Sequence, residues 1–220
     1  MSKKIMFNDK FGLTQAVLDG RKTMTRRIIR PETYKGQPVR GFRVTGSKDI
    51  RLSVEMLVYD GDCDDFVPMY IQPKYELGEV VAVAQSYMDV DRFHRKGRNA
   101  AYLEYLDSIL PELKLYPGWG NKMFVKADLM PHHIEITGIK VERLQDISDE
   151  DCLKEGIYRL DSANGNGGIA YSFVGASDKK HIGLYNTPRD AFEVLIDKVS
   201  GKGTWESNPF VFVYEFKLID

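Results

Sequence analysis

The chain has 220 residues, of which 43% are hydrophobic and 29% are charged, and its formal net charge is −1 at pH 7. This composition is typical of a globular protein with one sizeable core, and no apolar run has the length of about 20 residues that crosses a membrane. The two cysteines, Cys63 and Cys152, lie far apart and share no metal-ligand spacing. We therefore expect a cytoplasmic protein with no membrane segment, metal or cofactor.

The charges are distributed unevenly along the chain. Residues 1–51 contain 13 Lys/Arg against 4 Asp/Glu, whereas residues 52–91 contain 1 against 9. A basic first third is compatible with a nucleic-acid partner. It is equally compatible with two segments that neutralise one another in the fold, so charge alone does not decide between them.

The N-terminal part predicts a strand, a helix and a basic loop. Lys4–Phe7 is a short strand candidate, and the apolar spacing of Asp9–Asp19 predicts a helix. Gly20 suits a helix end because glycine adopts positive φ without strain. Gly20–Arg27 then forms a basic loop, and Pro31–Ser47 predicts a connecting loop or an irregular hairpin.

The acidic middle of the chain predicts a hairpin and a buried strand. Arg51–Tyr59 alternates apolar and polar residues, and Phe66–Ile71 is its expected partner. Glu79–Ala84 is a candidate for a buried strand. Residues 89–121 are polar, with helical spacing over Asn99–Leu110, and indicate an insertion.

Two further strands are predicted at Lys122–Ala127 and at His133–Arg143. Ser148 is followed by three acidic residues, which predicts an N-capped short helix that ends near Gly156. Asp161–Lys180 is rich in Gly, Ser and Asn and is expected to form a mobile loop.

The C-terminal part predicts a helix and a strand. Thr187 is the expected N-cap of a helix that starts at Pro188 and ends before Gly201, and Phe210–Leu218 is strongly β-prone. The whole pattern predicts an α+β protein of mostly antiparallel strands with flanking helices, closed or nearly closed as a small β-barrel. We expect a single domain over residues 1–220, with insertions near 31–75, 89–121 and 161–182.

The basic loop is the most informative stretch. Its sequence is Gly-Arg-Lys-Thr-Met-Thr-Arg-Arg, so four cations and two hydroxyls follow directly after a predicted helix end. Arginine and hydroxyl groups both donate hydrogen bonds to phosphate oxygens, which favours a polyanionic ligand. A solvated basic turn is the alternative.

Four segments together resemble the ASCH domain, a relative of the PUA RNA-binding barrel, and in particular its longer, phage-associated members. They are residues 16–27, 77–83, 136–157 and 205–216. The resemblance implies a PUA-like barrel with a cleft at the basic loop, and a function in binding RNA or a modified nucleoside. The ligand-binding residues would then include Arg21, Thr23, Arg26 and Arg27.

Some small bacterial members of that family hydrolyse N4-acetylcytidine, and the resemblance carries their catalytic residues to Lys22, Thr25 and Glu155. A threonine hydroxyl becomes nucleophilic when a base takes its proton, and a desolvated lysine can be that base. A carboxylate can orient the ammonium or transfer a proton. Each residue also has a structural alternative: Lys22 contacts phosphate only, Thr25 caps a turn, and Glu155 pairs with an arginine.

The chain departs from the family where other cleft residues are expected. The Arg and Glu of a Trp-Val-Arg-Glu motif are replaced by Ala84 and Gln85, and the Arg of Met-Pro-Arg is replaced by His132. These losses favour binding over catalysis. Tyr87 and Trp119 are aromatic candidates for base stacking, with His132 beside the same cleft. A third possibility is a phage or mobile-element accessory protein that acts through protein contacts.

Overall fold

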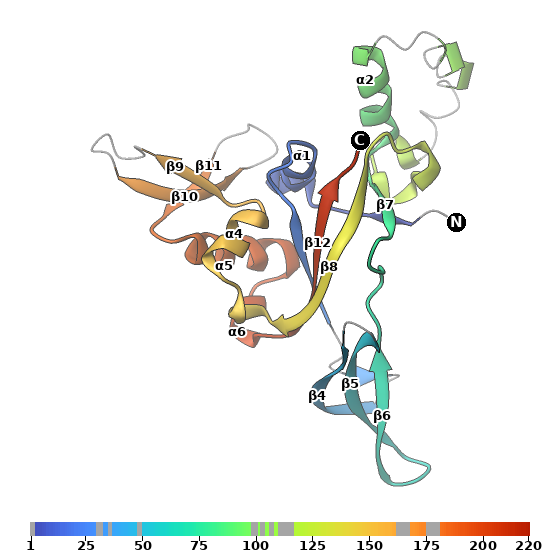
Figure 1. The fold of residues 1–220 in the computed structure, drawn as a ribbon, viewed down its shortest axis with the longest axis vertical. Coiled ribbons are helices and arrows are strands. Elements are labelled where there is room, and N and C mark those ends of the chain that lie inside the picture. Colours follow the sequence, from blue (N-terminus) through green and yellow to red (C-terminus); the bar gives the residue numbers. More distant parts are fainter. Residues whose placement is uncertain are drawn as a thin grey trace.

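The structure is a computed structural model that describes residues 3–29, 33–34, 37–47, 50–97, 101, 104–105, 108–109, 117–161, 168–174 and 181–220. The molecule is an α+β protein with a central sheet, a helical layer beside it and two smaller sheets (Figure 1). Within these residues no helix combines the length and apolar character needed to cross a membrane.

The central sheet has five strands in the order β1-β7-β8-β12-β2. Their bounds are β1 Lys4–Ile5, β7 Val80–Val83, β8 His133–Arg143, β12 Phe210–Leu218 and β2 Met24–Ile28. β1 and β7 run parallel, and the other neighbours are antiparallel. Because β1 and β2 lie at opposite edges, the hydrogen bonds between described strands leave this sheet open.

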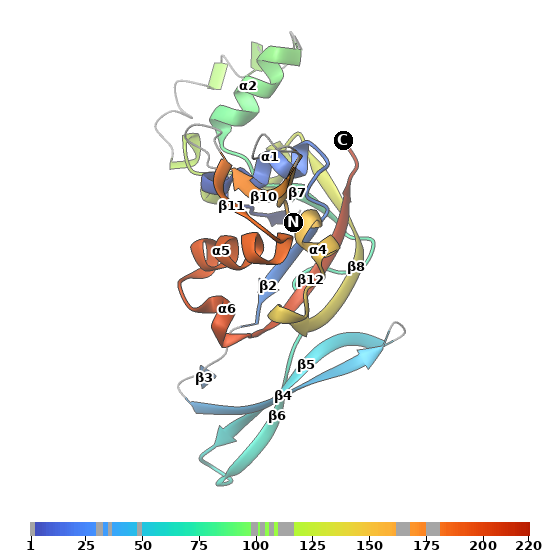
Figure 2. The ribbon, with the colours of Figure 1, turned by 90° about the vertical axis from the view of Figure 1, so that its left-hand side faces the viewer.

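Two smaller sheets flank the central one. One has the order β11-β10-β9, and the other has the order β3-β4-β5-β6. Their bounds are β9 Tyr158–Asp161, β10 Ile169–Val174, β11 His181–Tyr185, β3 Thr33–Tyr34, β4 Gln37–Ser47, β5 Ile50–Asp60 and β6 Asp65–Ile71. The β3–β6 sheet extends away from the helical layer, at the lower end of both views (Figures 1 and 2).

The helices are short apart from two. The α-helices are α1 Leu13–Leu18, α2 Tyr87–Gly97, α4 Asp149–Lys154, α5 Pro188–Ser200 and α6 Thr204–Ser207. The 3-10 helices are η1 Asp9–Phe11, η2 Pro117–Trp119, η3 Lys122–Phe124, η4 Ala127–Leu129 and η5 Leu144–Asp146. α4, α5 and α6 lie together beside β2 and β12, whereas α2 projects from the end of β7 (Figures 1 and 2).

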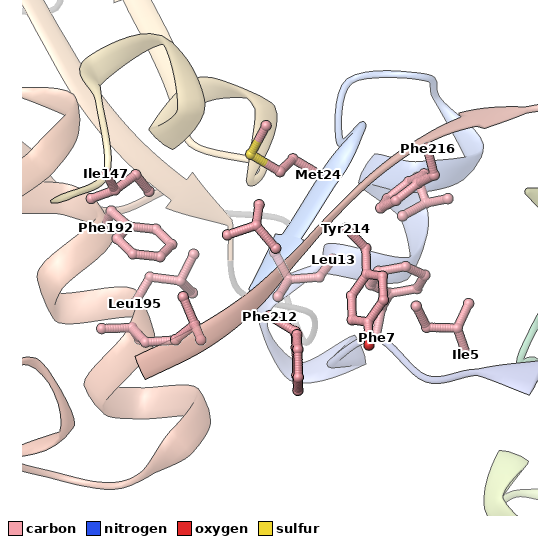
Figure 3. Packing of buried hydrophobic residues seen from close by; sticks show 14 of the residues in the cluster. Ile5, Phe7, Leu13, Met24, Ile147, Phe192, Leu195, Phe212, Tyr214 and Phe216 are labelled. Atoms are coloured by element: carbon pink, nitrogen blue, oxygen red, sulfur yellow. The ribbon is translucent and has the colours of Figure 1, made fainter. Parts of the chain in front are cut away.

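One hydrophobic core joins the central sheet to α5. Phe192 and Leu195 of α5 are buried in the same cluster as Phe212 and Tyr214 of β12 and Phe7, which follows β1 (Figure 3). Burial of an aromatic or leucine side chain contributes roughly 1.5–3 kcal/mol, so this packing fixes α5 beside the edge strand β2.

Most predicted elements are confirmed. The strands of the hairpin β5–β6 and the strands β7, β8 and β12 fall on their predicted ranges within a few residues. Both predicted caps are present: the Ser148 side chain accepts from Asp151 N, and the Thr187 side chain accepts from Asp190 N. The coarse class, α+β, is also confirmed.

Four predictions need correction. The second half of the basic loop is strand β2, because its backbone pairs with β12 from Met24 to Ile28. The helix predicted over Asp9–Asp19 is split into η1 and α1 by Gly12 at φ +62°. Within Asp161–Lys180, residues 169–174 form β10, and 162–167 and 175–180 lie outside the described residues.

The strand predicted at Lys122–Ala127 is wrong, since this segment contains η3 and the start of η4. Asn121 caps η3 by accepting from Met123 N, and the Lys122 ammonium bonds the Phe7 carbonyl and the Asp9 carboxylate. The Lys122 side chain is held by these partners, and the segment forms 3-10 turns instead of pairing as a strand. The helix predicted at Asn99–Leu110 falls mostly outside the described residues.

Candidate functional site

The basic segment is held in place by backbone hydrogen bonds. Gly20 has φ +71°, and the amides of Arg21 and Lys22 then both donate to the Ala16 carbonyl at 2.9 Å. The Thr23 amide donates to the Lys154 carbonyl at 3.0 Å. The segment is therefore an ordered turn between α1 and α4 and not a solvated one.

Lys22 is buried and forms an ion pair with Glu155. Its side chain is 1% exposed, and its Nζ lies 2.5 Å from Glu155 Oε2. The same nitrogen donates to the carbonyl oxygens of Met24, at 2.7 Å, and Glu155, at 2.8 Å. All three ammonium hydrogens are thus donated to protein acceptors.

Arg26 is neutralised by three carboxylates. Its Nη2 lies 2.6 Å from Glu142 Oε1 and 2.9 Å from Asp151 Oδ2, and its Nη1 lies 3.2 Å from Glu155 Oε1. Lys140 joins the same network through Glu142 and Asp151. Lys154 also lies 3.6 Å from Asp151 Oδ1, so the three carboxylates are shared by four cations, of which Lys22 and Arg26 are buried.

The pKa shifts follow from burial and pairing. Burial lowers the pKa of Lys22 from its ordinary value, and the attraction of Glu155 opposes that effect only in part. Burial alone would raise the pKa of Asp151, but hydrogen bonds from Arg26 and Lys140 hold that pKa below its usual value. Burial raises the pKa of the Cys152 thiol to about 12, so this thiol is inert.

A cavity of about 460 Å³ lies beside this network, in the size range of small-molecule sites. The turn before β2, β2 itself and the C-cap of α4 contribute Lys22, Thr25 and Glu155, respectively, to its wall. The segment after β1 and helix α5 supply the apolar wall, which includes Met6, Phe7, Phe192, Leu195 and Val199.

Thr25 belongs to this wall and is 5% exposed. Its hydroxyl makes no hydrogen bond to Lys22 or to any other residue in the part of the chain that the structure describes. The structure therefore brings Lys22, Thr25 and Glu155 to one cavity, with Lys22 and Glu155 in direct contact.

Arg27 lines the cavity and has no carboxylate in ion-pair contact among the described residues. Its Nη2 donates to the Met6 carbonyl at 2.6 Å, and the guanidinium lies 5.6 Å from the centre of the Phe7 ring. Among the described residues no carboxylate pairs with it. Burial lowers the pKa of Arg27 from its ordinary value. The guanidinium is half-buried, and the N–H donors that the Met6 carbonyl does not occupy have the chemistry to bind an anion.

The other predicted ligand residues lie elsewhere. Arg21 stacks on Tyr158, with its guanidinium carbon 3.9 Å from the ring centre, and Thr23 is half-buried outside the cavity wall. Tyr87, Trp119 and His132 lie around α2, η2 and the start of β8, and none lines the cavity. His132 instead contacts the Phe93 ring at 4.7 Å.

Several site residues escaped the sequence interpretation. Glu142 and Asp151 pair with Arg26, whereas the sequence pattern indicates Asp151 only as an acidic residue in a first helical turn. For the part of the cavity wall that α5 supplies, the sequence indicates only an apolar helix face. Gln85, a position that the sequence singles out, does not line the cavity; it is buried, and its Oε1 has no hydrogen-bond partner among the described residues.

No group of three or more metal-ligating side chains occurs in the described ranges. Comparison of the chain with protein-family models, with curated proteins and with solved structures gave no match in any of the three.

Proposed function

We propose that the protein is an ASCH-type, PUA-like protein that binds RNA, with one nucleoside unit in the cavity between β2 and α5. The observation that carries the proposal is the half-buried Arg27 guanidinium, which lines this cavity without a carboxylate in ion-pair contact among the described residues. The remaining features of the cavity support the same ligand class.

The division of charge supports Arg27 as the residue that contacts the ligand anion. Lys22 and Arg26 are neutralised by Glu155, Glu142 and Asp151, so they fix the shape of the wall. Arg27 has five N–H donors, and one of its nitrogens donates to the Met6 carbonyl. The donors that remain can bind phosphate oxygens in a fork geometry.

The apolar part of the cavity suits a nucleobase. Phe7 and Phe192 lie on the wall together with Leu195 and Val199. A base has an apolar face that stacks on aromatic rings, and each such contact contributes about 1–3 kcal/mol. A phosphate near Arg27 and a base near the α5 wall would together occupy the cavity.

We also propose that the central sheet curves towards a PUA-like barrel. β1 and β2 are the two edges of the five-stranded sheet, and the bond from Arg27 to the Met6 carbonyl links the ends of these edges. A link of this kind supports a sheet curved towards closure, as a PUA-like barrel requires.

Titration with labelled single-stranded RNA at two salt concentrations tests the binding proposal. Counterion release predicts that the affinity falls steeply as salt rises, and that Arg27→Met weakens binding and flattens the slope. Arg159→Met is the matched control, because Arg159 is an exposed arginine outside the cavity that pairs with Asp161. A flat salt response of the wild type would contradict the proposal.

Amide hydrolysis is the second candidate, because the Thr25 hydroxyl has no hydrogen-bond partner among the described residues and lines the same cavity as the buried Lys22–Glu155 pair. In that reaction Lys22 first loses a proton to Glu155 and then takes the Thr25 proton. The Thr25 oxygen attacks the acyl carbon, and the C–N bond breaks as the leaving amine takes a proton from the Lys22 ammonium. Water then hydrolyses the acyl ester: its OH goes to the acyl group, which leaves as a carboxylic acid, and its proton restores the Thr25 hydroxyl, while Glu155 returns its proton to Lys22.

Incubation with N4-acetylcytidine and chromatographic detection of cytidine tests this second candidate. Turnover by the wild type that is lost in Lys22→Ala and Thr25→Val would establish hydrolysis. Absence of turnover in the wild type, with RNA binding retained, would leave binding as the function.

A further inference from the structure

A second cavity adjoins the first at Arg27. It measures about 510 Å³, and its lining shares Met6, Arg27 and Ile28 with the first cavity. Its other walls come from β6 and the segment after it, and from β12, which contributes Phe212 and Tyr214. The Arg27 guanidinium, without a carboxylate in ion-pair contact among the described residues, therefore lines two cavities of similar size.

The second cavity has an aromatic wall that its own hydrogen bonds hold rigid. The rings of Tyr75 and Tyr214 meet edge to face with centres 5.2 Å apart. The Tyr75 hydroxyl donates to the Lys4 carbonyl at 3.0 Å, and the Tyr214 hydroxyl accepts from the Lys74 amide at 2.8 Å. A rigid aromatic wall is suited to a flat, apolar group such as a base.

The charge of this cavity has one sign. Among the described lining residues, Lys4, Arg27 and Lys74 are cationic and none is acidic. The Lys4 ammonium is held by the carbonyls of residues 122, 123 and 125, whereas Lys74 is exposed, with its ammonium 5.3 Å from the centre of the Tyr75 ring. Lys74 and Arg27 thus leave a positive potential at the junction and in the outer part of the cavity.

We propose that the two cavities bind consecutive nucleotides of one RNA strand, with the connecting phosphodiester on Arg27. The inference rests on the proposed function, because it assumes a nucleoside unit in the first cavity. It adds that the minimal ligand is a dinucleotide, and that a free nucleoside occupies only half of the site.

Calorimetric titration of ligands of increasing size tests the inference. For each of the four bases the series contains the nucleoside, its 3′- and 5′-monophosphates and the dinucleoside monophosphate. For at least one base we expect a monophosphate to bind more tightly than the nucleoside, and the dinucleotide to bind about tenfold more tightly again, as one stacked base contributes.

Two variants separate the contributions. Arg27→Met should remove the advantage of the phosphate. Ile71→Trp, which fills the second cavity, should reduce the affinity for the dinucleotide to that for the monophosphate and leave nucleoside binding unchanged. Tyr70→Trp is the matched control, because Tyr70 is exposed on the same strand and lies outside both cavities. Lys74→Met is a second test of this cavity, because Lys74 is an exposed residue of its lining whose replacement does not perturb the core.

The outcomes distinguish the inference from the proposed function. Equal affinity of the wild type for the dinucleotide and the monophosphate would overturn the two-cavity site while nucleotide binding stands. An unchanged preference of Ile71→Trp for the dinucleotide would overturn it too. Failure of every ligand in the series to bind would overturn the proposed function itself and the two-cavity site with it.

Discussion

Lys22 Nζ and Glu155 Oε2 lie 2.5 Å apart, although 133 positions separate the two residues in the sequence. The pair is buried, and the Glu155 carboxylate also accepts from Arg26 at 3.2 Å. One carboxylate at the end of α4 thus neutralises two cations of the N-terminal segment. This contact fixes the wall of the first cavity.

Loss of the Glu155 charge is expected to destabilise the protein more than loss of the Lys22 charge. Glu155→Gln leaves two buried cations with less compensation and should lower the free energy of unfolding by about 3–5 kcal/mol. Lys22→Met leaves the carboxylate paired with Arg26 and should cost less. Urea denaturation of both variants and of the double variant measures the order, and the reverse order would contradict this account.

The protein is expected to lose stability in acid partly through Asp151. Its pKa is lowered in the folded state, because hydrogen bonds from Arg26 and Lys140 outweigh the effect of burial. The stabilisation is therefore complete above the unfolded pKa of about 3.9 and is lost as the pH falls through the lower, folded value. Asp151→Asn should show a shallower decline in unfolding free energy below about pH 4. Asp149→Asn, on the exposed side of the same helical turn, is the control and should decline like the wild type.

Arg27→Met should separate stability from binding. The substitution removes one hydrogen bond, to the Met6 carbonyl, and one half-buried cation without a carboxylate in ion-pair contact among the described residues. We expect the free energy of unfolding to change by no more than about 1 kcal/mol, while affinity for RNA falls at least tenfold. Thermal melting and RNA titration of the same sample measure the two effects. A large loss of stability with unchanged affinity would show that Arg27 is structural.

Gly156 is expected to tolerate alanine less well than Gly20. Both have positive φ, +106° and +71°, so each substitution strains the backbone by about 1 kcal/mol. A Cβ at Gly156 would also lie 3.3 Å from Leu13 Cδ2 and 3.7 Å from Lys22 Cδ, whereas at Gly20 nothing lies within 4 Å. Gly156→Ala should therefore lower the melting temperature further than Gly20→Ala. Equal losses would indicate that the contact with Leu13 relaxes freely.

Local patterns predicted the elements whose stabilising interactions lie close in sequence. The Ser148 and Thr187 caps involve atoms three residues away, and β12 is β-prone along its whole length. The segment Lys122–Ala127 was mispredicted because its conformation depends on Phe7 and Asp9, more than 110 positions away. Similarly, β2 is a strand because β12 pairs with it, which no local pattern of the basic segment indicates.

The sequence by itself determined that a cationic, hydroxyl-bearing segment follows a glycine turn, and that an acidic short helix lies later in the chain. Only the tertiary structure decided which of these cations pair with carboxylates and which remain available to bind a ligand anion. It places Glu142, Asp151 and Glu155 against Lys22 and Arg26 and leaves Arg27 without a carboxylate among the described residues. The physical reason is that the interaction energy of a charge depends on its distance from other charges and on how deeply it is buried. Both depend on contacts across more than 100 positions, which a local pattern does not record.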